Sequence, residues 1–320
     1  MMKFLVFLSA VASQQSATNA FTLFKQSCTH VPTSLHAAGG PPQYEKFQGT
    51  LNRADQVGDG SFMLHIDTED VVEYEPGHVL ALEMKAKDDD IVNGEESKTY
   101  KDEKENGGWM RGPYTVSRST DKSIDILIKV VGEKSKQFST SKSGTPVQFG
   151  GKFHVPILEG IDVDTTKRVV MISTGVGVGP CIGAIEKAFE QESFPPIDLI
   201  TSYRTEGEVL FRDYLDLLQK ENADKFSWKT IISSEQGRVS SSADSLRVLT
   251  DTNSNAGLTH YHLIGNGQMV SEFKAGLQQA GVKEDKVTVE MYFNHKAEVD
   301  QDAVDRIATA VALETNAVPQ

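Results

Sequence analysis

The spacing of apolar residues changes once along the chain, near residue 160, and this change limits the folds that are open to it. Before it, apolar side chains occupy alternate positions, as in the run from Ile124 to Val130. Such alternation is typical of strands buried on one face, and turn signals such as Pro-Gly, Asp-Gly and Ser-Gly separate several runs of this kind. A series of short strands predicts a small antiparallel β-barrel.

After the change, short apolar runs alternate with helical patterns. The run Val169–Ile172 is wholly apolar, as expected of a strand that is covered on both faces. Pro180 is expected to open the helix that follows, because proline suits the first helical turn. We expect further strands near residues 197–200, 229–233, 260–264 and 286–293, and an amphipathic helix near 304–311. Repeated strand–helix units imply a doubly wound parallel sheet.

The expected fold is therefore an N-terminal antiparallel β-barrel followed by an α/β domain with a doubly wound parallel sheet. We place a presequence at residues 1–42, the barrel domain at 43–162, and the α/β domain with a C-terminal helical extension at 163–320. The length of 320 residues suits two domains of about 150 residues each.

Residues 1–42 have the character of a targeting sequence. Lys3 precedes the apolar run Phe4–Ala12, which is too short to span a bilayer and suits the core of a signal peptide. A cleavage-like stretch ends at Ala20, and Phe21 begins a segment without acidic residues. This arrangement resembles the signal plus transit peptides of algae with complex plastids and predicts a plastid (chloroplast) location. An ordinary secretory signal is the alternative.

Charge and cysteine content exclude several classes of protein. The chain has 32 Lys and Arg against 45 Asp and Glu, a net charge of −13 at pH 7. Such a surface repels nucleic-acid phosphates, so no nucleic-acid partner is expected. Of two cysteines only Cys181 follows the presequence, which argues against a disulfide framework or a Cys-rich metal site. The histidines have no ligand-like spacing, so no metal is predicted, and no integral membrane segment is expected in the mature chain.

A glycine-rich turn joins the first strand of the α/β part to its helix. It runs from Ser173 to Pro180 with the sequence STGVGVGP. Glycines at this place allow the backbone to approach a pyrophosphate, and the helix N-terminus supplies free N–H groups and a partial positive charge. The turn predicts a nucleotide site that includes Thr174, Gly175 and Gly177. A tight turn without a ligand is the alternative.

Two motifs in the barrel part could hold a flat ring and a phosphate. The first runs from Arg111 to Ser117 (RGPYTVS), where a tyrosine beside an arginine can stack on an electron-rich ring and pair with its charge. The second, Gly132–Ser135 (GEKS), can offer N–H groups, a hydroxyl and a cation to phosphates. Each motif taken alone also suits an ordinary surface turn.

In this order the motifs resemble those of the ferredoxin–NADP reductase superfamily, in which an FAD-binding barrel precedes an NAD(P)-binding domain. The resemblance runs from about residue 46 to residue 293. The superfamily's Arg-x-Tyr-Ser/Thr corresponds to Arg111 and Tyr114-Thr115, with one extra residue, and its Gly-x-x-Ser to Gly132–Ser135. Its Cys-Gly-x-x-x-Met corresponds to Ile264–Met269, where Ile264 replaces the cysteine.

The resemblance implies that the chain binds FAD, rather than FMN, and NADP or NAD. The candidate cofactor-binding residues are Arg111, Tyr114, Thr115, Ser117, Gly132, Lys134, Ser135, Thr174, Gly175, Gly177, Pro180, Arg204, Arg238, Gly265 and Met269. Arg204 and Arg238 follow the second and third expected strands with no acidic residue directly at the strand end, which favours NADPH because a 2′-phosphate needs cations. Pairing of the two arginines with Glu206 and Glu235 is the alternative.

Glu290 and Tyr292 are the candidate catalytic residues. The resemblance places them at the junction of nicotinamide and flavin, and two residues that lie two apart on a strand share a face. Plant-type members end at this tyrosine, whereas here 28 residues follow it. We expect this tail to block or replace the usual stacking of the tyrosine. An ordinary sheet strand without a catalytic role is the alternative.

The predicted function is that of an FAD-dependent oxidoreductase. It would move electrons between NAD(P)H and an unidentified acceptor, with ferredoxin as a candidate partner. The alternative is a catalytically idle nucleotide-binding or regulatory protein that retains the reductase fold, which the departures at Ile264 and Val176 motivate.

Overall fold

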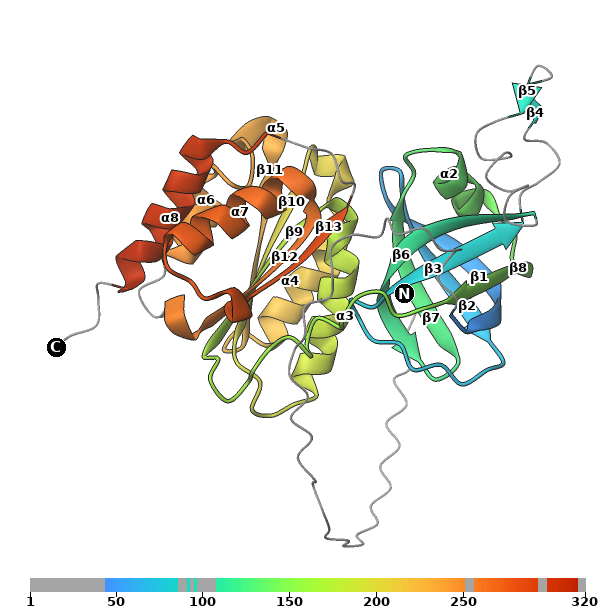
Figure 1. The fold of residues 1–320 in the computed structure, drawn as a ribbon, viewed down its shortest axis with the longest axis horizontal. Helices are drawn as coiled ribbons and strands as arrows, with labels where there is room; N and C mark the ends of the chain where they lie inside the picture. The colour runs from blue at the N-terminus through green and yellow to red at the C-terminus, as the bar shows by residue number, and fades with distance from the viewer. Residues whose placement is uncertain are drawn as a thin grey trace, which may run out of the picture. The chain divides into compact units, whose positions relative to one another are not determined.

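The computed structural model describes residues 44–85, 91–92, 95–96, 108–250, 256–292 and 298–315. The predicted presequence lies outside these residues. From Tyr44 onward the chain forms one compact unit, in which a barrel is followed by an open sheet (Figure 1). No helix in the described part of the chain is both long enough and apolar enough to span a membrane.

Six antiparallel strands close the barrel in the order β1-β2-β7-β6-β3-β8. They are β1 (Lys46–Gly58), β2 (Ser61–Thr68), β3 (Val79–Lys85), β6 (Trp109–Thr120), β7 (Ser123–Lys129) and β8 (Thr145–Gly150), while β4 (Ile91–Val92) and β5 (Glu95–Glu96) pair only with each other. The alternating apolar side chains point inward, as the sequence pattern predicts, and Ile124, Ile126 and Ile128 are all buried there. Helix α2 (Glu133–Thr140) contributes Phe138 to the same core.

Five parallel strands form the second sheet in the order β11-β10-β9-β12-β13. They are β9 (Arg168–Thr174), β10 (Ile197–Tyr203), β11 (Phe226–Ile232), β12 (Thr259–Asn266) and β13 (Val287–Tyr292). The strand order reverses between β9 and β12, so connections leave toward opposite faces of the sheet. The predicted fold class, an antiparallel barrel followed by a doubly wound parallel sheet, is confirmed.

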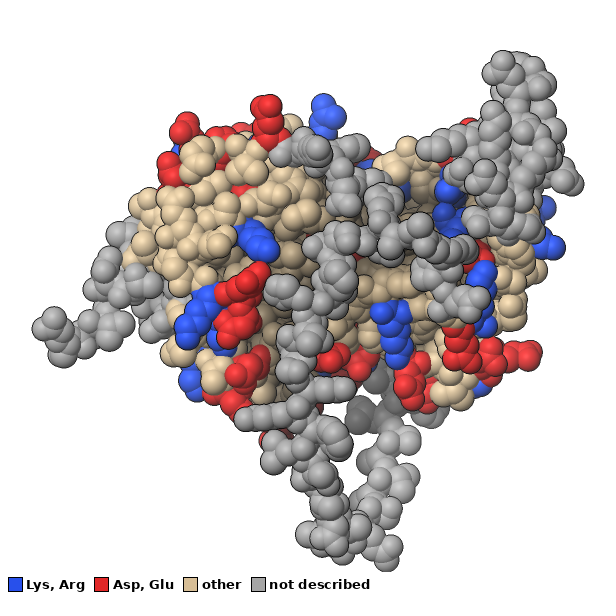
Figure 2. All heavy atoms as spheres, in the orientation of Figure 1, with Lys and Arg blue, Asp and Glu red and all other residues tan. Residues whose placement is uncertain are grey.

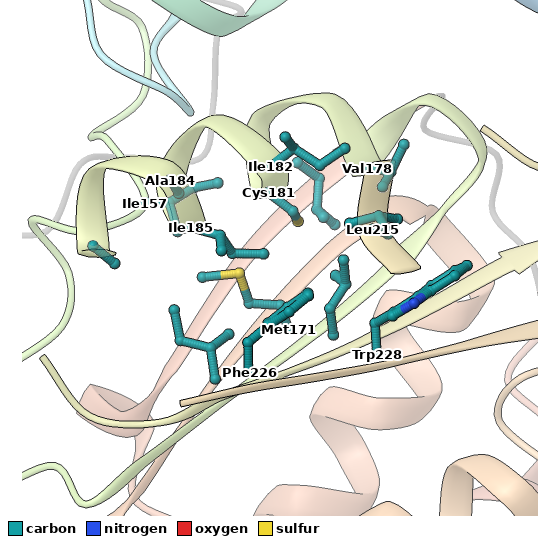
Figure 3. Packing of buried hydrophobic residues seen from close by; sticks show 14 of the residues in the cluster. Ile157, Met171, Val178, Cys181, Ile182, Ala184, Ile185, Leu215, Phe226 and Trp228 are labelled. Atoms are coloured by element: carbon teal, nitrogen blue, oxygen red, sulfur yellow. The ribbon is translucent and has the colours of Figure 1, made fainter. Parts of the chain in front are cut away.

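Helices cover both faces of this sheet. They are α3 (Val178–Phe189), α4 (Arg212–Glu221), α5 (Ser233–Gln236), α6 (Ala243–Leu249), α7 (Gly267–Gln279) and α8 (Gln301–Thr315), with 3₁₀ turns at Gly175–Gly177, Glu206–Glu208, Ala256–Leu258 and Glu284–Lys286. On one face, Cys181 and Ile185 of α3 pack with Met171 and Phe226 of the sheet (Figure 3). On the other, α7 and α8 pack together through residues such as Phe273.

Helices α3 and α2 differ from the sequence-based expectation for identifiable physical reasons. Helix α3 begins at Val178, two residues before Pro180, because a 3₁₀ turn already winds the chain at Gly175–Gly177. Helix α2 has no counterpart in the expectation, which treated Gly132–Ser135 as a turn. Its sequence is polar apart from Phe138, so it has no apolar stripe to reveal it.

Strand β6 of the barrel packs directly against α3 of the α/β part. A Cβ on Gly183 would lie 1.8 Å from the Ser117 carbonyl oxygen, and one on Gly179 would lie 2.5 Å from Ser117 Oγ, so only glycine permits this approach. Beside this contact Arg118 donates twice to Glu186, at 2.6 and 2.7 Å. The close packing fixes β6 relative to the carboxyl ends of the parallel strands.

The charged surface mixes both signs. In the face shown in Figure 2, acidic and basic side chains are interspersed over the described residues. The net negative charge is thus not gathered into one acidic patch on this face.

Candidate functional site

A cavity of about 440 Å³ lies where all five parallel strands end. Its lining residues are Ser61, Lys129, Val131, Thr174, Gly175, Val176, Ser202, Tyr203, Arg204, Glu208, Leu210, Ser233, Arg238, Val239, Asn266, Gln268, Met269 and Tyr292. The cavity therefore sits at the carboxyl edge of the sheet, beside the point where the strand order reverses. Open α/β sheets bind their ligands in this crevice.

The glycine-rich turn forms the centre of the cavity wall. Gly175 has φ +55°, and a Cβ there would meet nothing within 4 Å, so its backbone faces open space. Thr174 Oγ1 accepts a hydrogen bond from Asn266 N at 2.7 Å and so ties the end of β9 to the end of β12. Gly265 has φ +127°, and a Cβ there would lie 2.1 Å from Thr174 Oγ1. The structure thus brings four predicted residues together around one backbone cradle: Thr174, Gly175, Gly177 and Gly265.

Of the two remaining predicted residues near this turn, Met269 lines the cavity and Pro180 does not. Met269 lines the cavity from the first turn of α7, whose N-terminus is capped by the Asn266 side chain. Pro180 is buried within α3 and is not among the described lining residues.

Three cations and one carboxylate are among the described lining residues. Arg204 directly follows β10, and Arg238 comes after β11 with the short, unpredicted helix α5 in between. Lys129 at the end of β7 is the third cation of the lining. Glu208 accepts from Lys129 Nζ at 3.2 Å and from the backbone N–H of Arg204 at 3.1 Å. The surplus of positive charge suits phosphate groups.

The arginines do not have the partners that the sequence suggested as the alternative. Glu206 pairs with Arg212 at 2.5 Å, and Arg238 lies 3.6 Å from Glu272 instead of pairing with Glu235. Lys129 and Glu208 were missed by sequence reasoning, because neither lies in a motif and both reach the cavity only through the tertiary fold.

Tyr114 faces the end of the barrel next to α2. Its ring meets Phe138 edge to face, with centroids 5.5 Å apart, and burial raises the pKa of its hydroxyl to about 12. Gly112 lies two positions earlier on the same face, and a Cβ there would be 2.9 Å from the Tyr114 ring. The Tyr114 ring therefore packs over Gly112, where a side chain would collide with it.

The structure does not bring Arg111 together with Tyr114. Residues three apart on a strand point to opposite faces, so the Arg111 side chain points away from the Tyr114 face of β6. Arg111 is instead the cross-strand neighbour of Glu83 on β3, with Nε 3.8 Å from the Glu83 carboxylate. Its guanidinium also lies over the ring of Tyr44, at 5.0 Å from the centroid. The extra residue in the motif thus moves the arginine to the other face of β6.

Gly132–Ser135 forms the first turn of α2. Ser135 Oγ accepts from the N–H groups of Val131 and Gly132, at 2.9 and 3.2 Å. Lys134 Nζ donates to the Arg111 carbonyl at 3.2 Å. A helix N-terminus with a lysine in its first turn is suited to binding an anion.

Ser117 has a packing role. It is fully buried against α3, and its Oγ accepts a hydrogen bond from Leu127 N at 3.3 Å. It does not line the described cavity.

A hydrogen bond between Thr115 and Glu290 joins the barrel to the sheet. The Thr115 hydroxyl on β6 donates a hydrogen bond to Glu290 Oε1 on β13. Glu290 is buried, and its Oε2 has no hydrogen-bond partner among the described residues. Burial raises the pKa of this carboxyl to about 7, although the Thr115 hydrogen bond lowers it. Glu290 can therefore hold or release a proton near neutral pH.

Tyr292 stands next to this carboxyl and lines the cavity. Burial and the neighbouring Glu290 raise the pKa of its hydroxyl well above the usual range, and a hydrogen bond with Thr115 lowers it. The predicted pair Glu290 and Tyr292 thus shares a face of β13, and Thr115 contacts both.

The position corresponding to the superfamily cysteine is apolar and buried. Ile264 has no exposed surface and lies in register with Glu290 on the neighbouring strand. The chain's Cys181 is buried in α3, where burial raises the pKa of its thiol. A buried thiol of this kind is unreactive.

The histidines of β12 have structural partners. His260 Nε2 and His262 Nδ1 both hydrogen-bond the Thr288 hydroxyl, at 3.0 and 2.9 Å. Burial lowers the pKa of the first to about 4 and of the second to about 3. Among the described residues, no group of three or more His, Cys, Asp or Glu side chains could hold a metal ion.

Comparison with known proteins agrees with this geometry. Residues 171–275 match the family described as Oxidoreductase NAD-binding domain. The NADH nitrate reductase of Volvox carteri is 26% identical over 129 residues, which cover 34% of this chain and 15% of that protein.

Two solved structures share the fold of both parts. A ferredoxin NADP⁺ reductase from Neisseria gonorrhoeae with bound FAD and NADP superposes with a TM-score of 0.62 at 16% identity, over 78% of this chain and 99% of that one. A flavohemoglobin from Malassezia yamatoensis with bound FAD and heme superposes with a TM-score of 0.61 at 19% identity, over 78% of this chain and 60% of that one. The chain therefore has the two-part fold of ferredoxin–NADP reductase-like proteins.

Proposed function

We propose that the protein is an FAD-dependent oxidoreductase that takes electrons from NADPH and passes them to an acceptor. The observation that carries the proposal is the junction of Thr115, Glu290 and Tyr292. There a barrel strand meets the end of a parallel strand, and a buried carboxyl keeps one oxygen unpaired among the described residues. An unpaired buried oxygen is costly unless a ligand or water completes it.

The barrel residues fit FAD. Tyr114 offers an aromatic face, while Lys134 and the N-terminus of α2 offer a cation and N–H groups. FAD is favoured over FMN because two solved structures that share the fold contain bound FAD. When bound, FAD accepts a hydride from reduced nicotinamide and passes electrons on.

The sheet residues fit a pyridine dinucleotide. The open backbone at Gly175 and the N-terminus of α3 suit its pyrophosphate. Arg204 and Arg238 suit a 2′-phosphate, which favours NADPH over NADH. Met269 and Tyr292 give the cavity an apolar and aromatic wall.

The chain's own residues have distinct tasks in this proposal. Thr115 orients the Glu290 carboxyl, and Glu290 holds a proton near the reacting groups. The buried Ile264 side chain excludes water from the part of the sheet next to Glu290.

Ferredoxin is a candidate acceptor on the basis of the sequence resemblance. The flavohemoglobin structure, which contains heme as well as FAD, makes a heme protein the alternative acceptor. We further propose that residues 1–42 direct the protein to a plastid, and a fluorescent protein fused after residue 42 tests this by its location in an alga with a complex plastid.

The test of the proposed function is a spectroscopic titration of the purified chain. We expect bound flavin with an absorbance band near ~450 nm, identified as FAD after release, and bleaching of that band by NADPH at lower concentrations than by NADH. Bound flavin that neither nucleotide bleaches contradicts the proposal.

A second candidate is a catalytically idle nucleotide-binding protein. The residue at position 112 favours this second candidate. On the Tyr114 face of β6, glycine occupies the place where the motif would put an arginine to pair with the flavin. Nucleotide binding without any flavin, from a preparation supplied with FAD, supports this second candidate.

A further inference from the structure

A fully buried carboxylate lies behind the nucleotide-type cavity. Glu272 on α7 has no exposed surface. Its Oε2 accepts from the Ser240 hydroxyl at 2.6 Å, and its Oε1 accepts from Gln268 Nε2 at 2.7 Å and from the backbone N–H of Asp300 at 3.2 Å. Arg238 completes the set, with a guanidinium nitrogen 3.6 Å from Oε2. Such a buried charge is stable only with partners of this kind.

The donors around Glu272 come from two different parts of the molecule. Arg238 and Gln268 both line the cavity. Asp300 instead stands directly before α8, where its carboxylate accepts from Asp302 N at 3.0 Å and its carbonyl accepts from Val304 N at 3.1 Å. Glu272 thus connects the start of the C-terminal helix to two side chains of the cavity wall.

Helix α8 is seated closely on α7. A Cβ on Gly276 would lie 2.6 Å from Ile307 Cγ2 and 2.9 Å from the Val304 carbonyl oxygen. Ile307 is fully buried in the same core as Phe273. A shift of α8 would therefore move Asp300 relative to Glu272.

The position of Arg238 depends on this arrangement. The Arg238 side chain is 45% exposed, so without a partner it would sample many rotamers. Glu272 engages one end of the guanidinium, and the remaining donors of the planar group can face the cavity. The preceding residue, Gly237, has φ +75° in a turn that carries Arg238 toward the site.

We propose that Glu272 is a positioning residue that orients Arg238 for a 2′-phosphate, and that α8 sets this selectivity through it. The inference rests on the proposed function, because it assumes a pyridine nucleotide in the cavity. It assigns the C-terminal extension to nucleotide selectivity in addition to any effect on Tyr292. Glu272 would act through Arg238 and would not itself touch the nucleotide.

The test compares two ligands that differ only in the 2′-phosphate. Binding of adenosine 2′,5′-bisphosphate and of 5′-AMP to the full chain is measured by calorimetry, for wild type and for Glu272→Gln, Gly276→Ala and Arg238→Ala. Lys274→Ala is the matched control, because Lys274 lies on α7 with its side chain 45% exposed and pairs with Glu284 at 3.9 Å.

We expect Glu272→Gln to reduce the preference for the 2′-phosphate by about five-fold or more, in the range of typical coupling between sites. Binding of 5′-AMP should stay as in wild type, which a general loss of structure would not allow. Gly276→Ala should change the preference in the same direction while the Glu272 side chain is kept. It provides the test if Glu272→Gln fails to fold.

The outcomes separate this inference from the proposed function. If Arg238→Ala lowers the preference while Glu272→Gln and Gly276→Ala leave it as in wild type, the inference is overturned and the NADPH site stands. An increased preference in Glu272→Gln also overturns it, since Glu272 would then only compete for Arg238. If wild type binds neither ligand, both the inference and the proposed function are overturned.

Discussion

Glu290 combines three properties that a purely structural residue seldom has together. It is buried, one of its oxygens has no partner among the described residues, and its pKa is raised to about 7. The Thr115 hydrogen bond satisfies the other oxygen. A carboxyl of this kind is suited to proton transfer at neutral pH.

This raised pKa makes stability depend on pH in a definite direction. The folded state holds the Glu290 proton more tightly than the unfolded state, whose pKa is near the ordinary 4.5. The resulting stabilisation is fully present below about pH 4.5 and is lost as pH rises through about 7, to a limit of roughly 3 kcal/mol. As the pH rises from roughly 5 to roughly 8, wild type should lose this stabilisation while Glu290→Gln does not. The variant should therefore become more stable relative to wild type over this range.

Urea unfolding at the two pH values measures this difference. Glu284→Gln is the control, because the Glu284 side chain is 87% exposed. If the difference in free energy of unfolding between Glu290→Gln and wild type is the same at both pH values, the Glu290 carboxyl does not titrate in this range.

At the scale of elements, two glycines at the carboxyl ends of the neighbouring strands β9 and β12 have different roles. Gly175 has a positive φ and open space around it, whereas Gly265 has a positive φ and no space for a Cβ. The first lines the cavity, and the second allows β12 to pass Thr174. Open space beside a cavity-lining backbone is what a bound pyrophosphate requires.

Alanine at these two positions should separate binding from stability. Gly175→Ala should cost about 1 kcal/mol of folding stability through its positive φ, and should weaken NADPH binding about ten-fold because the methyl group enters the phosphate path. Gly265→Ala should cost about 3 kcal/mol or more, since its Cβ would overlap Thr174. Thermal unfolding and NADPH titration of both variants check this, and equal stability losses with unchanged binding in Gly175→Ala would contradict it.

The sequence predicted elements well where apolar periodicity was strong. The alternating run from Ile124 lies in β7 except for Val130, which follows the end of the strand, and the apolar run of β9 lies inside the observed strand. Helix α2 was missed because Phe138 is its one apolar side chain in the core, so its sequence has no apolar stripe. The face of Arg111 could not be read from the motif, because one extra residue in a strand reverses the side chain. Lys129 and Glu208 reach the cavity through contacts between distant segments, which no local pattern records.

At the scale of the whole molecule, the barrel and the sheet form one working unit through β6. Ser117 packs against the glycines of α3, Arg118 pairs with Glu186, and Thr115 reaches Glu290. These three residues of a single strand thus hold the proposed flavin face against the proposed nucleotide cavity. This arrangement would bring a donor bound in the sheet part next to an acceptor bound in the barrel part, which is the requirement for direct transfer between them.

The most direct test of this account is the rate of flavin bleaching in a single turnover with NADPH. The FAD-loaded chain is mixed rapidly, without oxygen, with NADPH or with NADPH that carries deuterium at the transferred position of the nicotinamide. We predict bleaching that is slower with the deuterated nucleotide, because the hydrogen passes directly between the two rings. No bleaching of bound FAD by saturating NADPH would contradict the account.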